Sequence, residues 1–215
     1  MVKNMIIAVV MLASLVSSAY AENSKKLVAL LLDETGSMQC RSLETTREYN
    51  RFIKKLDNGT DFYLARFNSG KYDHFDAPLE SSKVGFLEDF SPENNTPLND
   101  SIYRFLKAVE QYDGYSKVII GILTDGEENS STKYSQDDVV KLIEEKKSLG
   151  WDISYMAVKL DDNDKDSFRQ AVGYNFVPSN RTNFISGTIG GVISTDSCTV
   201  ALTSWSDRIK SRKDT

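Results

Sequence analysis

Two short apolar runs, at residues 26–32 and 118–123, constrain the fold of this 215-residue chain more than any other feature. A strand that is covered on one face alternates apolar and polar residues. An unbroken apolar run is instead typical of a strand that is buried on both faces, as in a parallel sheet flanked by helices. The two runs therefore predict two strands in the interior of such a sheet.

Segments with helical spacing lie between the predicted strands. Apolar residues recur three and four positions apart, as on one face of a helix, at Ile102, Phe105, Leu106 and Val109. Further helices are predicted at 43–55, 139–150 and 165–172, and further strands at 61–67, 72–75, 153–160 and 176–177. Since a turn at 68–71 joins 61–67 to 72–75, the strand at 72–75 is predicted to be an antiparallel edge.

Alternating strands and helices predict a doubly wound α/β fold, with a mostly parallel sheet, helices on both faces and one antiparallel edge strand. We expect a single domain at 22–215, with a core at about 26–195 and a helical C-terminal tail. The stretch 184–209 is predicted to be mostly helical although it contains Gly187, Gly190 and Gly191.

Residues 1–21 have the features of a secretory signal peptide. Lys3 precedes an apolar run at 5–16, and a small-x-small pattern ends at Ala21. The alternative is an uncleaved anchor, but about a dozen apolar residues fall short of the roughly 20 that span a membrane as a helix. We expect a secreted or periplasmic protein that meets the membrane only through its signal peptide.

Charge and cysteine content narrow the possible partners. The net charge is −5, which argues against nucleic acid, because phosphates require a basic face. Cys40 and Cys198 are the only cysteines and could form a disulfide in an oxidising compartment, or remain two buried thiols. The single histidine, His74, lies in an alternating strand pattern, and we assign it no catalytic role.

Three loops rich in oxygen atoms follow predicted strands or precede a predicted helix. Asp33, Thr35 and Ser37 follow the first buried run, Asp125 follows the second, and Thr96 lies between them in the chain. In open α/β sheets, ligands bind beyond the carboxyl ends of the strands. Carboxylates and hydroxyls without thiols or imidazoles favour Mg²⁺, Mn²⁺ or Ca²⁺. The pattern therefore predicts a site for one divalent cation.

The order Asp33-x-Thr35-x-Ser37, Thr96, Asp125-Gly126 resembles the metal-ion-dependent adhesion site of von Willebrand factor type A domains, with Thr35 where the family usually has serine. The resemblance covers roughly residues 26–180. The segments around Thr96 and Asp125 are similar to those of small stand-alone bacterial and phage members of the family. The resemblance implies that Ser37, Thr96 and Thr35 coordinate the metal directly, whereas Asp33 and Asp125 act mainly through water. It also implies an open coordination position for an Asp or Glu carboxylate of a partner protein.

Other interpretations remain open for these residues. Asp33 alone could be a helix cap. The neighbouring acids lack motif positions and are expected to be rim charges or caps; they are Glu34, Glu127, Glu128 and Asp100.

A Mg²⁺-dependent phosphotransferase with Asp33 as nucleophile is the main alternative function, because residues 33–37 also resemble the Asp-Lys-Thr-Gly-Thr motif of phosphoryl-aspartate ATPases. No strand-end lysine stands out for that chemistry, and Thr96 would have no role in it. A metal site that has lost its function is a further alternative. We expect a binding module and not an enzyme.

Overall fold

In the computed structural model of the chain, the structure describes residues 25–125, 128–158, 191–195, 205–206 and 209–210. The strands are β1 Lys26–Asp33, β2 Thr60–Phe67, β3 Tyr72–His74, β4 Leu79–Glu80, β5 Lys117–Thr124, β6 Asp152–Val158 and β7 Gly191–Thr195. The α-helices are α2 Ser42–Ile53, α3 Leu98–Val109 and α4 Gln136–Ser148, and the 3₁₀ helices are η1 Gly36–Arg41 and η2 Ser81–Lys83.

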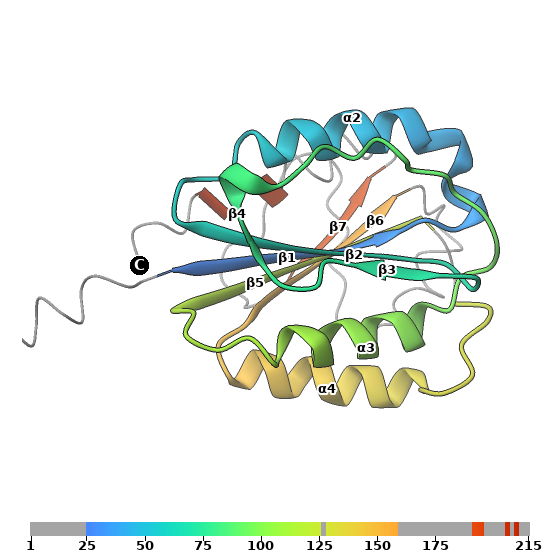
Figure 1. Cartoon of the computed structure of the whole chain (residues 1–215). Coiled ribbons are helices and arrows are strands. Elements are labelled where there is room, and N and C mark those ends of the chain that lie inside the picture. The colour runs from blue at the N-terminus through green and yellow to red at the C-terminus, as the bar shows by residue number, and fades with distance from the viewer. Residues whose placement is uncertain (1–24, 126–127, 159–190, 196–204, 207–208, 211–215) are drawn as a thin grey trace, which may run out of the picture.

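The strands form one twisted sheet in the order β3-β2-β1-β5-β6-β7, and β4 pairs with the edge of β2 (Figure 1). The pairs β1–β2, β1–β5, β5–β6 and β6–β7 are parallel, whereas β3 and β4 run antiparallel to β2. The two apolar runs thus become the adjacent strands β1 and β5, in register from Lys26 opposite Lys117. The prediction of a mostly parallel sheet with an antiparallel edge is confirmed.

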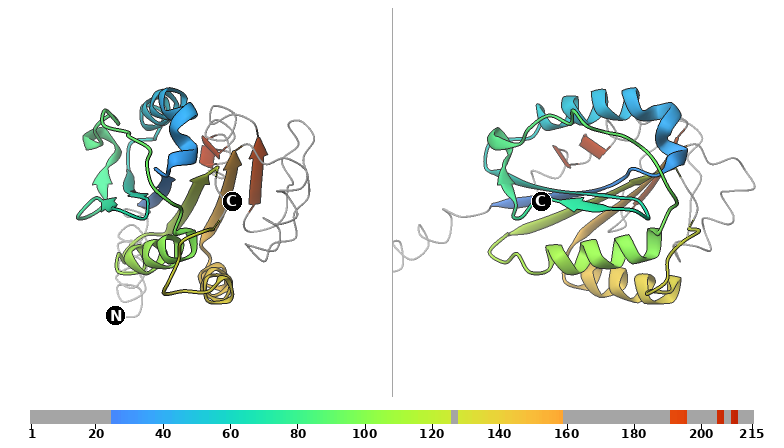
Figure 2. Two further views of the ribbon diagram at one scale, coloured as in Figure 1. Left: turned by 90° about the vertical axis from the view of Figure 1, so that its right-hand side faces the viewer. Right: turned by 45° about the vertical axis from the view of Figure 1, so that its right-hand side comes forward.

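Helices cover both faces of the sheet. Helix α2 lies on one face, and α3 and α4 lie side by side on the other (Figures 1 and 2). Each face has its own apolar core: one includes Leu31, Phe105 and Ile143, and the other includes Leu30 and Phe52. Because alternate residues of β1 enter the two cores, all of its residues from Leu27 to Leu32 are apolar, which accounts for the unbroken run.

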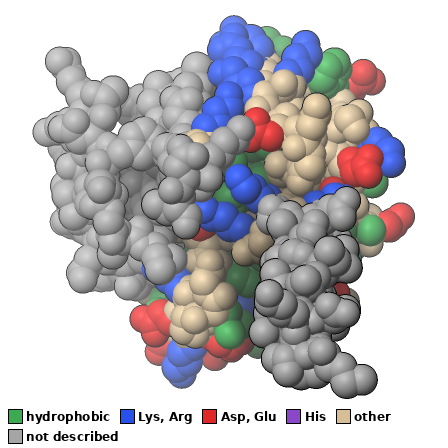
Figure 3. Space-filling view, turned by 90° about the vertical axis from the view of Figure 1, so that its left-hand side faces the viewer, with side chains coloured by type: hydrophobic (Ala, Val, Ile, Leu, Met, Phe, Trp, Pro, Cys, Tyr) green, Lys and Arg blue, Asp and Glu red, His purple; other side chains and the backbone are tan. Residues whose placement is uncertain are grey.

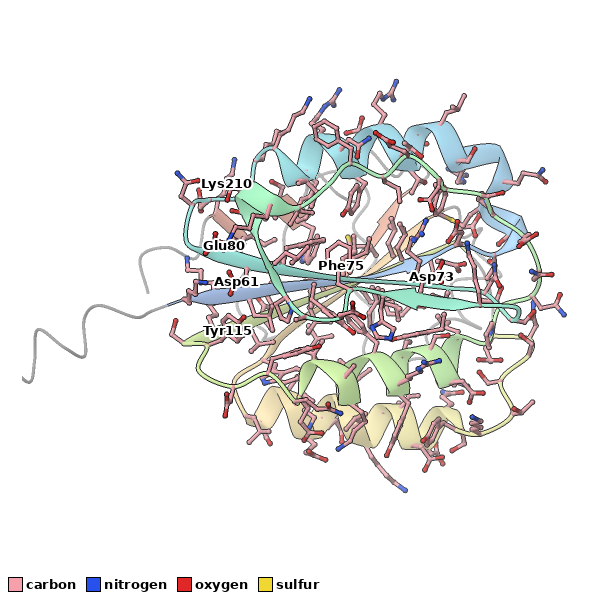
Figure 4. The ribbon with its side chains drawn as sticks, in the orientation of Figure 1. Asp61, Asp73, Phe75, Glu80, Tyr115 and Lys210 are labelled. Carbon is pink, nitrogen blue, oxygen red and sulfur yellow. The ribbon has the colours of Figure 1, made fainter. Side chains whose placement is uncertain are left out.

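The parallel strands all point toward the same end of the molecule. At the opposite end, shown in Figure 3, the described surface carries basic and acidic side chains next to one another. There Tyr115 donates a hydrogen bond of 2.8 Å to the buried Asp61, and Lys25 pairs with the same carboxylate (Figure 4). These contacts satisfy the buried Asp61 carboxylate at this end of the sheet.

The predicted helices at 43–55, 102–109 and 139–150 are observed, and the last is followed by Gly150 at φ +87°. The left-handed conformation that ends this helix is one that glycine adopts without strain. His74 is exposed and lies on β3, in agreement with the strand pattern of the sequence.

The prediction of helix across 184–209 is wrong at 191–195, which form β7 at the sheet edge. The β-branched residues Val192, Ile193 and Thr195 favour a strand, and the preceding glycines disfavour a helix. The short strand β4 was not predicted.

Several predictions concern residues that the structure does not describe. The signal peptide at 1–21, the helix at 165–172, the strand at 176–177 and Cys198 lie outside the described residues, and so does the side chain of Cys40. The single domain at 22–215 and the disulfide stay predictions. Within the described ranges, no helix is both long enough and apolar enough to cross a membrane.

Candidate metal centre

Asp33 ends β1 in the interior of the protein. Its side chain is fully buried, and it accepts hydrogen bonds from the backbone N–H of Thr35 at 2.8 Å and from the hydroxyl of Thr124 on the adjacent strand β5. Burial raises the pKa of Asp33 to about 6; the hydrogen bonds from Thr124 and Thr35 oppose this shift, and the nearby Asp125 adds to it. Both carboxylate oxygens are therefore held in place at the end of the central strand pair.

Ser37 links the first loop to the loop after β5. Its hydroxyl donates a hydrogen bond of 2.6 Å to the carboxylate of Asp125 and lies 3.2 Å from the hydroxyl of Thr35. One chain of contacts thus runs from Thr124 through Asp33 and its neighbours to Asp125. The structure brings together four of the five predicted site residues, which lie up to 92 positions apart in the sequence.

The backbone of Thr96 is bonded to the loop after β5, and its own loop is bonded to the first loop through Asn94. The N–H of Thr96 donates to the side-chain carbonyl of Asn129 at 2.8 Å, and its carbonyl accepts from the N–H of Asn129 at 3.1 Å. Two residues earlier, the carbonyl of Asn94 accepts a 2.9 Å hydrogen bond from Gly36 N–H in the first loop. A Cβ at Gly36 would lie 3.4 Å from that carbonyl, so the loops approach each other closely there.

The three loops meet at the carboxyl end of the sheet, which faces the viewer in Figure 2 (left). Ser37 is exposed and Asp125 half-buried, whereas Asp33, Thr35 and Thr96 are buried. The site thus has an accessible rim formed by Ser37 and Asp125 above a buried base. A ligand that reaches the rim meets a hydroxyl and a carboxylate first.

The side chains at this site provide oxygen atoms only. The five residues contribute two carboxylates and three hydroxyls. Among the residues that the structure describes, no group of three or more His, Cys, Asp or Glu side chains could hold a metal ion. The donor set fits a hard cation such as Mg²⁺, Mn²⁺ or Ca²⁺ and not Zn²⁺. A cation would also favour the ionised form of Asp33, which burial alone disfavours.

Glu34 is neither an exposed rim charge nor a helix cap, the two roles predicted for it from the sequence. Its side chain is fully buried, and it accepts a 2.8 Å hydrogen bond from the N–H of Ser91. Arg66 and Lys71 lie 3.6 and 3.3 Å from its two carboxylate oxygens, and Asp73 on β3 pairs with both cations (Figure 4). The carboxylate of Glu34 can be buried because Arg66 and Lys71, from the β2–β3 hairpin, supply positive charge beside it. The sequence around Glu34 does not indicate these two partners.

Glu128 and Asp100 hold backbone groups in the neighbouring loops. Glu128 accepts from Asn99 N–H at 2.7 Å in the first turn of α3, which agrees with its predicted role as a cap. Asp100 accepts from the N–H groups of Thr132 and Tyr134, at 3.0 and 2.8 Å. Glu127 lies outside the described residues.

Comparisons with known proteins support the fold. No family profile and no curated protein matches the sequence. The structure resembles the vWF domain of the pilus tip protein Mfa5 from Porphyromonas gingivalis, with a TM-score of 0.62, 9% identity, and coverage of 87% of this chain and 96% of that one. For manganese-loaded TRAP from Plasmodium vivax, the TM-score is 0.52, with 12% identity and coverage of 85% and 74%.

The ArnB paralog VWA2 from Sulfolobus acidocaldarius is similar over 86% of this chain, with a TM-score of 0.54 and 15% identity. The match covers 45% of VWA2, so this chain spans less than half the length of that protein. The Mfa5 match is a vWF domain, and VWA2 is named for the same type of domain. The chain therefore has the fold of a von Willebrand factor type A domain.

Proposed function

We propose that this chain is a protein-binding module in which a divalent cation coordinates a carboxylate of a partner protein. Ser37, Thr96 and Thr35 would hold the cation, and Asp33 and Asp125 would act on it mainly through water. The bound cation would supply a Lewis-acidic coordination position that an Asp or Glu side chain can fill. The observation that carries the proposal is the 2.6 Å hydrogen bond from Ser37 to Asp125, because it joins an oxygen donor of the first loop to one of the loop after β5, and a single ion could contact both.

Burial favours this function over a phosphotransferase. Asp33 has no exposed surface, and both of its carboxylate oxygens accept hydrogen bonds. A nucleophilic carboxylate must reach the phosphorus atom of its substrate, whereas a carboxylate that supports a metal through water needs no such access. The manganese-loaded state of TRAP, a protein of the same fold, also supports a divalent cation at this site.

We further propose that the protein acts outside the cytoplasm after removal of residues 1–21. The pilus tip protein Mfa5 has the same fold, which is consistent with a role at a cell surface. Amino-terminal sequencing of protein recovered from the periplasm or medium tests cleavage directly. A chain that retains Met1 in the membrane fraction would contradict it.

Calorimetric titration with Mg²⁺ and Mn²⁺ after treatment with a chelator tests the cation site. We expect one ion per chain for the natural sequence and for Ser148→Ala, which removes an exposed hydroxyl at the distant end of α4. Ser37→Ala should weaken binding at least about tenfold, a loss of about 1.4 kcal/mol. Equal affinity in Ser37→Ala and Ser148→Ala would reject the site.

Two further assays test the use of the cation. A peptide array that compares Asp with Asn at each position should show Mg²⁺-dependent binding to Asp alone. A chromogenic phosphate ester should not turn over with Mg²⁺; turnover that is lost in Asp33→Asn would favour the phosphotransferase instead.

A further inference from the structure

A groove of about 800 Å³ adjoins the candidate metal centre. Its walls are the β2–β3 turn, the exposed side of α3 and the loop at 130–134. Pro97, which directly follows Thr96, lines the groove, and so does Ser69, whose N–H donates a 3.0 Å hydrogen bond to the carbonyl of Asn95. The groove therefore begins beside a proposed metal ligand and continues along α3.

The groove is basic although the chain is acidic. Four cationic side chains and one carboxylate line it, in a chain of net charge −5; they are Lys71, Arg104, Lys107, Lys133 and Asp100. Backbone N–H groups already occupy the carboxylate of Asp100. Lys71 and Lys107 have carboxylate partners, whereas Arg104 and Lys133 form no ion pair with any residue that the structure describes. Each of these two side chains could therefore form an ion pair with a carboxylate of a ligand.

Arg104 is held in a position suited to a carboxylate. The central carbon of its guanidinium group lies 3.9 Å from the centre of the Tyr72 ring. A guanidinium group that rests on an aromatic face keeps its N–H edges available, and those edges match the two oxygens of a carboxylate. The aromatic contact therefore orients Arg104 for a planar, two-point interaction.

The remaining lining suits an extended peptide. The rings of Tyr103 and Tyr134 line the groove and are stacked on each other, with their centres 3.7 Å apart and an angle of 10° between them. Tyr72 and Ser130 also line the groove, and their buried hydroxyls have no hydrogen-bond partner among the described residues. A nucleic acid would bring many closely spaced phosphates to a protein whose net charge repels them.

We propose that this groove binds an acidic segment of the partner protein, with a carboxylate on Arg104 and Lys133. The inference rests on the proposed function, in which another carboxylate of the same segment binds the cation. Because an extended chain advances about 3.3 Å per residue, a segment with several Asp or Glu side chains along it could place one on the metal ion and another on Arg104 and Lys133. The groove thus selects partners with several clustered acids over partners with one.

Two fluorescein-labelled peptides test the proposal by fluorescence anisotropy in Mg²⁺. One contains a single Asp among Gly and Ser residues, and the other contains four Asp residues in the same background. The natural protein should bind the four-Asp peptide more tightly. The double variant Arg104→Glu/Lys133→Glu should bind it at least about tenfold more weakly. The control Lys54→Glu/Lys55→Glu makes the same charge change at exposed positions after α2, on the other face of the sheet, and should retain the affinity of the natural protein.

The outcomes separate the groove from the metal site. If chelator abolishes binding of both peptides while the groove variant binds both normally, the groove proposal is overturned and the metal function stands. If the groove variant loses the four-Asp peptide while chelator has no effect, the groove is supported and the metal function fails. No binding of the four-Asp peptide up to about 1 mM, or tighter binding of a single-stranded oligonucleotide, would also overturn the groove proposal.

Discussion

The indole ring of Trp205 lies against the backbone of Gly121 in the middle of β5. A Cβ at position 121 would come within 2.5 Å of the Cζ2 atom of Trp205 and within 2.8 Å of two more indole atoms. The indole ring also stacks on Phe52 of α2, with the ring centres 4.9 Å apart. The absence of a side chain at Gly121 therefore lets a residue near the C-terminus pack into the core beneath α2.

Gly121→Ala should destabilise the protein by about 1–3 kcal/mol, because the buried indole has no room to move away from the added methyl group. Urea unfolding followed by tryptophan fluorescence would measure the loss. Gly85→Ala is the matched control, since a Cβ there meets nothing within 4 Å, and it should change stability by less than about 0.5 kcal/mol. Equal effects of the two substitutions would show that Trp205 does not occupy this place.

Glu34→Gln should destabilise the protein by about 1–3 kcal/mol. The substitution leaves Arg66, whose side chain is 12% exposed, beside an uncharged amide, although Asp73 and Asp89 still offset part of its charge. Denaturant unfolding should be measured for Glu34→Gln and for Glu88→Gln, which removes an exposed acid in the adjacent loop. Both substitutions change the net charge equally, so a larger loss of stability in Glu34→Gln would be due to the burial of Glu34. A larger loss in Glu88→Gln would mean that the charge network around Arg66 does not support the loop.

Asp100 should contribute to stability near neutral pH and cease to do so in acid. Burial acts to raise its pKa, but hydrogen bonds from the backbone of Thr132, Tyr134 and Lys133 outweigh burial, so the pKa is lowered in the folded protein. A carboxylate with a lowered folded pKa stabilises the protein above its unfolded pKa, about 3.9, and this contribution disappears as the pH falls through the folded value. The difference in unfolding free energy between the natural protein and Asp100→Asn should therefore shrink below about pH 4. A difference that is constant from pH 7 to pH 3 would contradict this assignment.

Asp33→Asn should separate stability from cation binding. In chelator, the variant should be as stable as the natural protein or more stable, because it removes a fully buried charge while keeping an oxygen that can accept from Thr35 N–H. In Mg²⁺ at a hundredfold excess over the dissociation constant, the natural protein should gain about 2.7 kcal/mol and the variant should gain far less. Thermal unfolding with and without Mg²⁺ measures both effects, and equal stabilisation of the two proteins would exclude Asp33 from the site.

The central part of the fold was predictable because its signals are local. The runs in β1 and β5 are apolar because those strands are covered on both faces, and the apolar spacing in α3 follows from its single buried side. Strand β4 was not predictable, because Leu79 and Glu80 are two exposed residues that pair with the edge of β2. This pairing depends on the path by which the chain comes back to the edge of β2 after β3, and that path produces no recognisable pattern in the sequence.

The candidate site was predictable to a similar degree. Its hydroxyls and carboxylates follow strands whose order places them at one end of the sheet, so their convergence follows from topology. The burial of Glu34 was not predictable, because Arg66 and Lys71 come from another part of the chain and their charges become relevant only after folding. Asn129, which holds the backbone of Thr96, was also missed, although its position after β5 marks the same loop.

The contact between Asp33 and Thr124 joins the two innermost strands at the point where the proposed site begins. The base of the site is consequently part of the hydrophobic interior, whereas Ser37 stands at the surface and can change without disturbing that interior. In related proteins that no longer bind a ligand, the position of Ser37 should therefore vary first and the position of Asp33 last. A comparison of such sequences would separate the residues kept for architecture from those kept for recognition.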